Sequence, residues 1–199
     1  MSKIRRLSLI ALTALVVAAS SGIASASAAE SEFRAESLPV TIKGSGSQEI
    51  GTTAGTISCP TSSQNGEAKS SATWWTVKVT NSGCTIGGVA ATVSWGECEI
   101  RYYTYSGLYI VCKGGVVKIT SESCVIEIEP QEVESVGFTN LGSGTTRTIA
   151  AVPKVKGLKY TQSAKCAGGA GTMTNGTLGG EILLKGFTGK GLQQGIFIE

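Results

Sequence analysis

Six cysteines constrain this 199-residue chain more than any other feature, because all of them follow a segment with the composition of an export signal. An even set of cysteines in an exported protein predicts disulfide bonds, which fix the segments that must lie together in the fold. In the chain-entropy model, closing loops of these lengths stabilises a fold by roughly 3–4 kcal/mol for each bond. The cysteines are Cys59, Cys84, Cys98, Cys112, Cys124 and Cys166.

The spacing of the cysteines favours one set of pairs. Cys98 and Cys112 flank a tyrosine-rich segment with a turn signal at Ser106-Gly107, so a hairpin there would bring these two cysteines together. The alternative is a metal site, but zinc clusters usually contain cysteines separated by only about two to four residues. This chain has no such spacing and no histidine, so we expect neither a metal nor another cofactor. We predict the bonds Cys59–Cys84, Cys98–Cys112 and Cys124–Cys166.

Residues 1–28 have the composition of a cleaved signal peptide. Lys3, Arg5 and Arg6 precede an apolar run, and small residues from Ala24 onward offer several cleavage sites. The alternatives are an uncleaved membrane anchor and a twin-arginine signal. We predict a secreted, extracellular protein without membrane insertion after cleavage, and a single domain over residues 29–199.

Removal of the signal peptide changes the charge of the chain. The full sequence has 17 basic residues and 14 glutamates, and Lys3, Arg5 and Arg6 belong to the predicted signal. The exported part is therefore close to neutral. A neutral surface lacks the basic patch that nucleic acids and anionic membranes require, so we expect no nucleic-acid partner.

Alternating apolar residues predict short strands along the exported region. Trp75, Val77 and Val79 alternate with polar residues, which places them on the inner face of a strand. The dipeptides Asn65-Gly66 and Asn175-Gly176 predict tight turns. We predict an all-β fold, a single antiparallel β-sandwich or alternatively a barrel, stapled by three disulfides. Further predicted strands cover residues 38–43, 54–59, 108–113, 115–121, 133–139, 145–152, 157–162, 170–174, 177–187 and 195–198.

Several segments carry a resemblance to known sequences. They are residues 55–59 (GTISC), 124–131 (CVIEIEPQ) and 138–147 (FTNLGSGTTR), followed by 157–161 (GLKYT). These segments are similar to those of a group of uncharacterised secreted proteins of comparable length from high-GC Gram-positive bacteria. The resemblance covers most of the exported chain and is most specific between residues 124 and 161. It implies export and β structure, and it assigns no catalytic residues.

The absence of two residue types excludes many kinds of active site. The chain contains no histidine and no aspartate, so a Ser-His-Asp triad and an aspartate-rich calcium loop cannot form. Glu127 and Glu129 share a strand face at about 6.6 Å, a separation that would suit a glycosidase pair. Alternation turns both toward solvent, whereas an acid catalyst needs an apolar pocket. We therefore predict a protein that is not an enzyme, with no catalytic residues, and a glutamate-based glycoside hydrolase is the third hypothesis.

Exposed aromatic residues are the candidate binding groups. In a strand, Trp74 and Trp75 point to opposite faces, so Trp75 belongs to the core and Trp74 faces outward. Trp74, Tyr103 and Tyr105, helped by Tyr102 or Tyr109, would stack on a sugar ring or anchor another extracellular protein. The alternative is that Trp74 packs against a loop or a second sheet. Our first hypothesis is a non-catalytic structural or binding protein, and the second is a carbohydrate- or cell-wall-binding module.

Overall fold

The structure is a computed structural model that describes residues 30–199, so the predicted signal peptide lies outside the described residues. Strands dominate the described region, together with a short 3-10 turn at Gly144–Thr146. The all-β, antiparallel prediction with three disulfides is confirmed. Nowhere in residues 30–199 does a helix reach the length and apolar character that a membrane span requires.

Most of the chain belongs to one continuous sheet. Neighbouring strands pair in the following order: β12 (Gln131–Glu134), β9 (Gly107–Cys112), β8 (Cys98–Tyr103), β4 (Trp74–Ser82), β3 (Gly55–Ala68), β2 (Val40–Thr52), β16 (Gly171–Phe187), β15 (Val155–Gln162), β11 (Cys124–Ile128), β10 (Val117–Ser121) and β7 (Thr92–Ser94).

Short strands extend this sheet at several points. β16 also pairs with one strand of a hairpin and with a two-residue strand near the C-terminus, while a small extension pairs with β3. The first and last strands of the described region form a separate pair. These elements are β13 (Val136–Leu141) with β14 (Thr148–Pro153), β17 (Gln193–Gln194), β5 (Thr85–Ile86) with β6 (Val89–Ala90), and β1 (Phe33–Ala35) with β18 (Ile196–Ile198).

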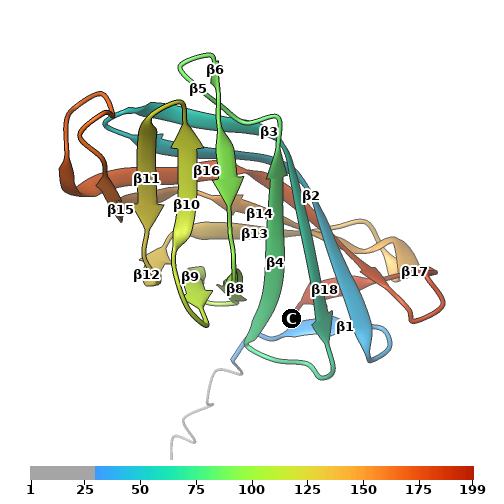
Figure 1. Ribbon diagram of the computed structural model, residues 1–199. Coiled ribbons are helices and arrows are strands. Elements are labelled where there is room, and N and C mark those ends of the chain that lie inside the picture. Colours follow the sequence, from blue (N-terminus) through green and yellow to red (C-terminus); the bar gives the residue numbers. More distant parts are fainter. Residues whose placement is uncertain (1–29) are drawn as a thin grey trace, which may run out of the picture.

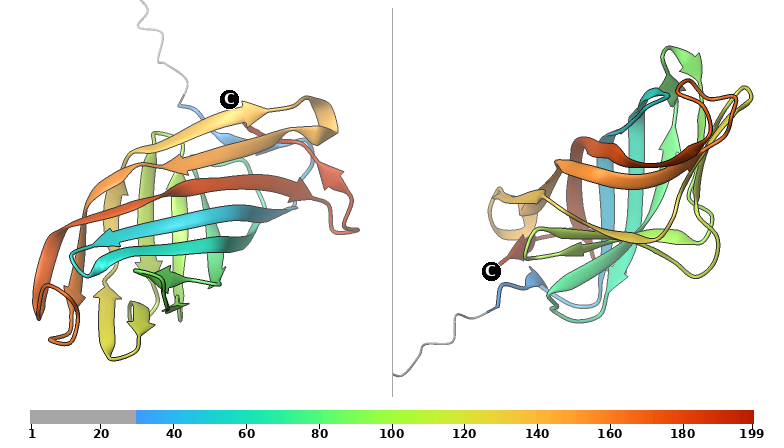
Figure 2. Two further views of the ribbon diagram at one scale, coloured as in Figure 1. Left: turned by 90° about the horizontal axis from the view of Figure 1, so that it is seen from above. Right: turned by 90° about the vertical axis from the view of Figure 1, so that its left-hand side faces the viewer.

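The predicted sandwich or barrel takes the form of one sheet that curls into a half-barrel (Figures 1 and 2). The curl brings β7 against β4 and brings β12 against β15. The Gln131 side-chain amide donates a hydrogen bond to the Lys159 carbonyl at 2.8 Å and accepts one from the Lys159 N–H at 2.9 Å. This side chain therefore bonds to β15 as a strand backbone would, at the place where β12, one end of the sheet, meets β15.

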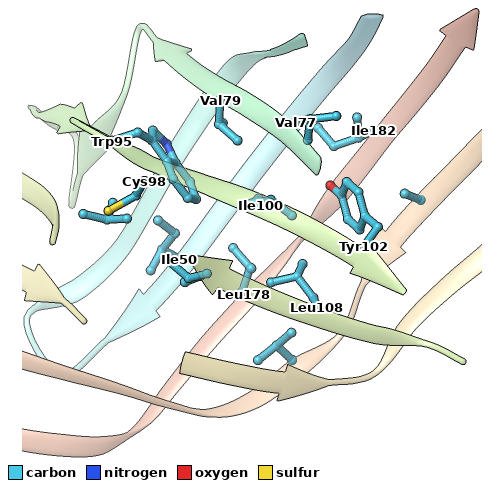
Figure 3. Packing of buried hydrophobic residues seen from close by; sticks show 14 of the residues in the cluster. Ile50, Val77, Val79, Trp95, Cys98, Ile100, Tyr102, Leu108, Leu178 and Ile182 are labelled. Atoms are coloured by element: carbon cyan, nitrogen blue, oxygen red, sulfur yellow. The ribbon is translucent and has the colours of Figure 1, made fainter. Parts of the chain in front are cut away.

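The inner face of the curl holds the hydrophobic core (Figure 3). Val77 and Val79 of β4 lie beside Ile100 of β8, as the alternation of apolar residues predicted. Trp75 stacks on Phe33 of β1 with ring centroids 5.0 Å apart and an interplanar angle of 21°. The first described strand therefore contributes a fully buried ring to the core.

Some inner positions hold polar side chains that bond to one another. The Gln64 amide donates to the buried Tyr102 hydroxyl at 2.9 Å, and burial raises the pKa of Tyr102 to about 12. Trp95 donates its indole N–H to Asn81 at 2.7 Å, and the Asn81 amide donates to Gln48 at 2.8 Å. A buried polar group that has a partner avoids most of the cost of losing water.

The two predicted Asn-Gly turns are wrong, since both dipeptides lie inside long strands. Asn65-Gly66 lies within β3 and Asn175-Gly176 within β16. Each glycine allows a close approach of a neighbouring backbone: a Cβ on Gly66 would lie 2.4 Å from the Thr76 carbonyl oxygen, and one on Gly176 would lie 2.8 Å from that of Leu158. Glycine serves here to make room in a strand, not to turn the chain.

The structure joins the cysteines in the predicted pairs, Cys59–Cys84, Cys98–Cys112 and Cys124–Cys166. Cys98 and Cys112 lie directly opposite each other in the β8–β9 hairpin, with Cα atoms 4.0 Å apart. The bond therefore fixes the register of the two strands that carry most of the predicted binding residues.

Candidate functional site

Aromatic side chains gather on the outer face of β4, β8 and β9, close to the β8–β9 turn. Trp74 of β4 lies opposite Tyr103 of β8, and Tyr109 comes from the same face of β9. Tyr105 comes from the turn between β8 and β9. We name Trp74, Tyr103, Tyr105 and Tyr109 the aromatic strip. Strand alternation turns it away from the core, so its rings are available to solvent.

Tyr103 lies at the centre of the aromatic strip and contacts each of the other three rings. The centroid of Tyr103 lies 6.4 Å from that of Trp74, 4.9 Å from that of Tyr105 and 4.8 Å from that of Tyr109. The interplanar angles are 40° for Trp74 and Tyr105 and 50° for Tyr109. Tilted pairs at these distances attract one another, so Tyr103 fixes the position of its neighbours.

Arg101 orients the indole ring of Trp74. Its guanidinium carbon lies 4.3 Å from the ring centroid, and its Nε donates a hydrogen bond of 3.4 Å to Oγ1 of Thr76, which lies opposite Arg101 on β4. A cation over an exposed ring contributes roughly 0.5–1 kcal/mol. The side chain of Trp74 still has 41% of its surface exposed, so the indole is both held in place and open to a ligand.

The β8–β9 turn places the two outer tyrosines. Ser106 has a φ of 71°, in the left-handed region, which reverses the chain within a short turn. A Cβ on Gly107 would lie 2.6 Å from the Tyr105 ring, so glycine leaves the space that this ring fills. Tyr105 donates a hydrogen bond of 3.5 Å to the Tyr109 hydroxyl, and Glu132 lies opposite Tyr109 on β12. The nearby Glu132 carboxylate, and after it Tyr105, raise the pKa of the Tyr109 phenol. The turn therefore holds the hydroxyl groups of Tyr105 and Tyr109 at one end of the aromatic strip.

A depression of about 330 Å³ borders the strip beside Trp74. The end of β3 and the segment that follows it form one wall, which includes Glu67 and Lys69. The start of β4, with Trp74 and Thr76, forms the other wall. A ligand on the indole would therefore also reach charged and hydroxyl groups.

The structure brings the three predicted binding residues, Trp74, Tyr103 and Tyr105, into one cluster. Tyr102 is buried in the core, so its suggested role beside Trp74 is wrong; alternation turns it inward between its exposed neighbours. Sequence reasoning missed Arg101 and Thr76. A signal was present in the alternation of β8, because Arg101 shares a strand face with Tyr103.

The glutamate pair considered for hydrolysis lies elsewhere in the sheet. Glu127 on β11 is partly exposed, with its carboxylate 3.8 Å from the Lys118 ammonium, and Glu129 is exposed just after the end of the strand. Their predicted solvent-facing position is confirmed. This arrangement is that of charged side chains on a wet strand face, where an isolated ion pair contributes little.

Comparison of the chain with protein-family models, with curated proteins and with solved structures found no match.

Proposed function

We propose that this chain is a secreted, non-catalytic binding protein and that its aromatic strip binds a glycan. The observation that carries the proposal is the exposed Trp74 indole, held by Arg101 and continued by three tyrosine rings. A flat ring can cover the C–H face of a sugar, while phenol hydroxyls exchange hydrogen bonds with sugar hydroxyls. Because the rings are positioned before binding, little side-chain entropy is lost when a ligand arrives.

The distribution of exposed apolar side chains favours a glycan over a protein partner. Beyond Trp74 and Tyr105 of the strip, the large exposed apolar residues of the described region come from other elements, so they do not enlarge the strip. Protein interfaces generally need a contiguous apolar centre, whereas the strip carries phenol hydroxyls and a guanidinium group among its rings. The residues outside the strip are Leu38, Val89, Leu141 and Leu192.

Two features support secretion. The composition of residues 1–28 is that of a signal peptide. The three disulfides of the described region belong to a kind of bond that persists mainly in oxidising compartments such as the cell exterior.

The proposal is tested by glycan-array screening of the oxidised, secreted protein, followed by calorimetric titration of the strongest hits. We expect Trp74→Ala to lower affinity by about tenfold or more, the usual effect of removing a central aromatic anchor. Leu141→Ala is the matched control, because Leu141 is 42% exposed, almost the same as Trp74, but lies at the end of β13. Its affinity should equal that of the wild type.

Three results would contradict this proposal. Failure to bind any glycan, or wild-type affinity in Trp74→Ala with the fold intact, would remove the glycan site. Release of new reducing ends from a polysaccharide panel, abolished by Glu127→Gln or Glu129→Gln, would overturn the non-catalytic part.

A further inference from the structure

β4 changes its pairing partner halfway along its length. Trp74 to Lys78 pair with β8, and Lys78 to Ser82 pair with β3, so the two sets of pairs overlap at Lys78. The first half of β4 is therefore not matched residue for residue with β3, and the second half is not matched with β8. A hollow opens on the β3 side of the first half of β4. Another opens between the second half of β4 and the segment before β8, where it reaches the inner side chains Val79, Trp95 and Cys98.

Three depressions follow β4 along these hollows. The first, described above, lies beside Trp74; the second, of about 500 Å³, lies around Thr76 and Lys78; the third, of about 310 Å³, lies beyond Lys78, next to the segment before β8. Neighbouring depressions share lining residues: Glu67 and Thr76 line the first two, and Lys78 and Glu99 line the last two.

The depressions together are long enough for several sugar units. From Trp74 to Thr80 the strand rises over six residues, which is about 20 Å at the usual rise of a strand. Trp74 lies at one end of this length, and the lining of the third depression contains Thr80, Glu97 and Lys113 at the other.

We infer that the three depressions form one groove along β4, and that it binds an extended, uncharged polysaccharide with one sugar stacked on Trp74. This inference rests on the proposed function and adds the class and length of the ligand. We refer to the three depressions together as the β4 groove.

The charges of the β4 groove favour an uncharged ligand. Its carboxylates come from Glu67, Glu97 and Glu99, and its ammonium groups come from Lys69, Lys78 and Lys113. The three carboxylates equal the three ammonium groups in number, so neither a polyanion nor a polycation meets a strong complementary field in the groove. Within residues 30–199, none of these side chains is in an ion pair, which leaves their donors and acceptors free for the hydroxyl groups of a ligand.

The groove also places glutamates together, but in a setting that suits binding. Glu97 and Glu99 line the third depression with Lys78 and Lys113. A glycosidase needs one carboxyl group enclosed in an apolar pocket, whereas Glu97 is exposed to solvent and shares its depression with two ammonium groups.

The test measures the affinity of the oxidised, secreted protein for three oligosaccharide series, each from disaccharide to hexasaccharide. Two series are uncharged, β-1,4-linked glucose and β-1,4-linked N-acetylglucosamine, and the third is anionic oligogalacturonate. We expect affinity to rise at least tenfold from disaccharide to hexasaccharide in an uncharged series. We also expect it to change less than about twofold when salt rises from 50 to 500 mM, because no counterions are released.

Two variants locate the far end of the ligand. Glu97→Ala should weaken hexasaccharide binding several-fold and leave disaccharide binding unchanged, because only the longer chain reaches the third depression. Glu181→Ala, which removes an exposed carboxylate on β16 outside the groove, is the matched control and should bind every length like the wild type.

The outcomes separate failure of the groove from failure of the proposed function. Equal affinity for disaccharide and hexasaccharide, with binding still lost in Trp74→Ala, would overturn the groove and leave the aromatic strip. Tighter, salt-sensitive binding of oligogalacturonate would overturn the uncharged ligand. No binding in any series would overturn both this inference and the glycan-binding proposal.

Discussion

Trp74 and Trp75 are neighbours in sequence, and the sheet gives them opposite environments. Trp75 is 5% exposed, stacks on Phe33 and belongs to the core, whereas Trp74 is 41% exposed and lies beneath a guanidinium group on the outer face. The same alternation separates Tyr102, buried against Gln64, from Tyr103 in the aromatic strip. Identical side chains therefore stabilise the fold on one face of β4 and β8 and remain available for binding on the other.

The residue type alone does not reveal the role of an aromatic side chain in this protein. The inner rings are surrounded on all sides, so their removal leaves a cavity. The outer rings contact only one another, Arg101 and the surface, so their removal leaves solvent in their place. Substitutions should therefore change stability on the inner face and binding on the outer face.

The largest difference is expected between the two tryptophans themselves. Trp75→Ala should lower the free energy of unfolding by roughly 3–5 kcal/mol, because it empties a buried site against Phe33. Trp74→Ala should lower it by less than about 1 kcal/mol, as is usual for an exposed position with a single cation–π contact. Denaturant unfolding of both oxidised variants measures the difference. Equal losses in the free energy of unfolding would show that the outer indole stabilises the fold as much as the inner one.

A second difference concerns alkaline pH. Burial raises the pKa of Tyr102 from 10.0 to about 12, so the folded protein keeps a proton that the unfolded chain releases. The stability that the buried, protonated Tyr102 phenol contributes is fully present below pH 10. It is lost as the pH rises toward 12, by roughly 1.4 kcal/mol for each pH unit. Wild type should therefore lose stability in this window relative to Tyr102→Phe, measured by urea unfolding at each pH.

Tyr109→Phe is the outer-face counterpart for this measurement. Glu132 and Tyr105 also raise the pKa of Tyr109, so the loss of stability has the same sign, but solvent screens the interaction at this exposed position. We expect Tyr109→Phe to follow the wild-type pH dependence closely. A wild-type curve parallel to that of Tyr102→Phe would instead contradict the assignment to the buried phenol.

Much of this fold was predictable from strict alternation and from the cysteines. The inner row of β4 and the β8–β9 hairpin were both expected, because apolar side chains recur at every second residue and a disulfide pairs the hairpin. β16 was predicted as two strands, 170–174 and 177–187, divided by the supposed turn at Asn175-Gly176. The later parts of β2 and β3, residues 44–52 and 60–68, were not predicted. Their inner positions hold small or polar residues such as Gly44, Gln64 and Gly66, which are buried or nearly so but carry no apolar pattern.

The candidate site was predictable only in part, for a different reason. Trp74, Tyr103 and Tyr105 stand out as residue types, but the position of Arg101 over Trp74 depends on the β4–β8 register. The β4 groove depends on where the pairing with β3 ends. Register between strands distant in sequence is set by the packed core, so a local sequence pattern does not contain it.

The Asn65-Gly66 dipeptide, which the sequence led us to interpret as a turn, lies where β3 closely approaches β4. A substitution at Gly66 tests how tight this approach is. Gly66→Ala should destabilise the protein by roughly 1–3 kcal/mol, because its Cβ would meet a carbonyl oxygen at 2.4 Å and force the strands apart. Gly179→Ala is the matched control, since the nearest atom to a Cβ there is the Pro153 oxygen at 4.0 Å. Urea midpoints of the two variants should differ clearly, and equal midpoints would mean that the strands yield at little cost.

The smallest effect concerns the contact that orients the outer ring. A double-mutant cycle of Trp74→Ala and Arg101→Ala, measured by denaturant unfolding, should give a coupling energy of roughly 0.5–1 kcal/mol, because the guanidinium lies 4.3 Å from the ring centroid. Arg101→Lys should keep the charge but lose the planar stacking, so part of the coupling should remain. A coupling of zero would mean that Arg101 does not hold the indole. Trp74 would then be less ordered than Trp75 as well as more exposed, and a ligand would have to orient the indole as it binds.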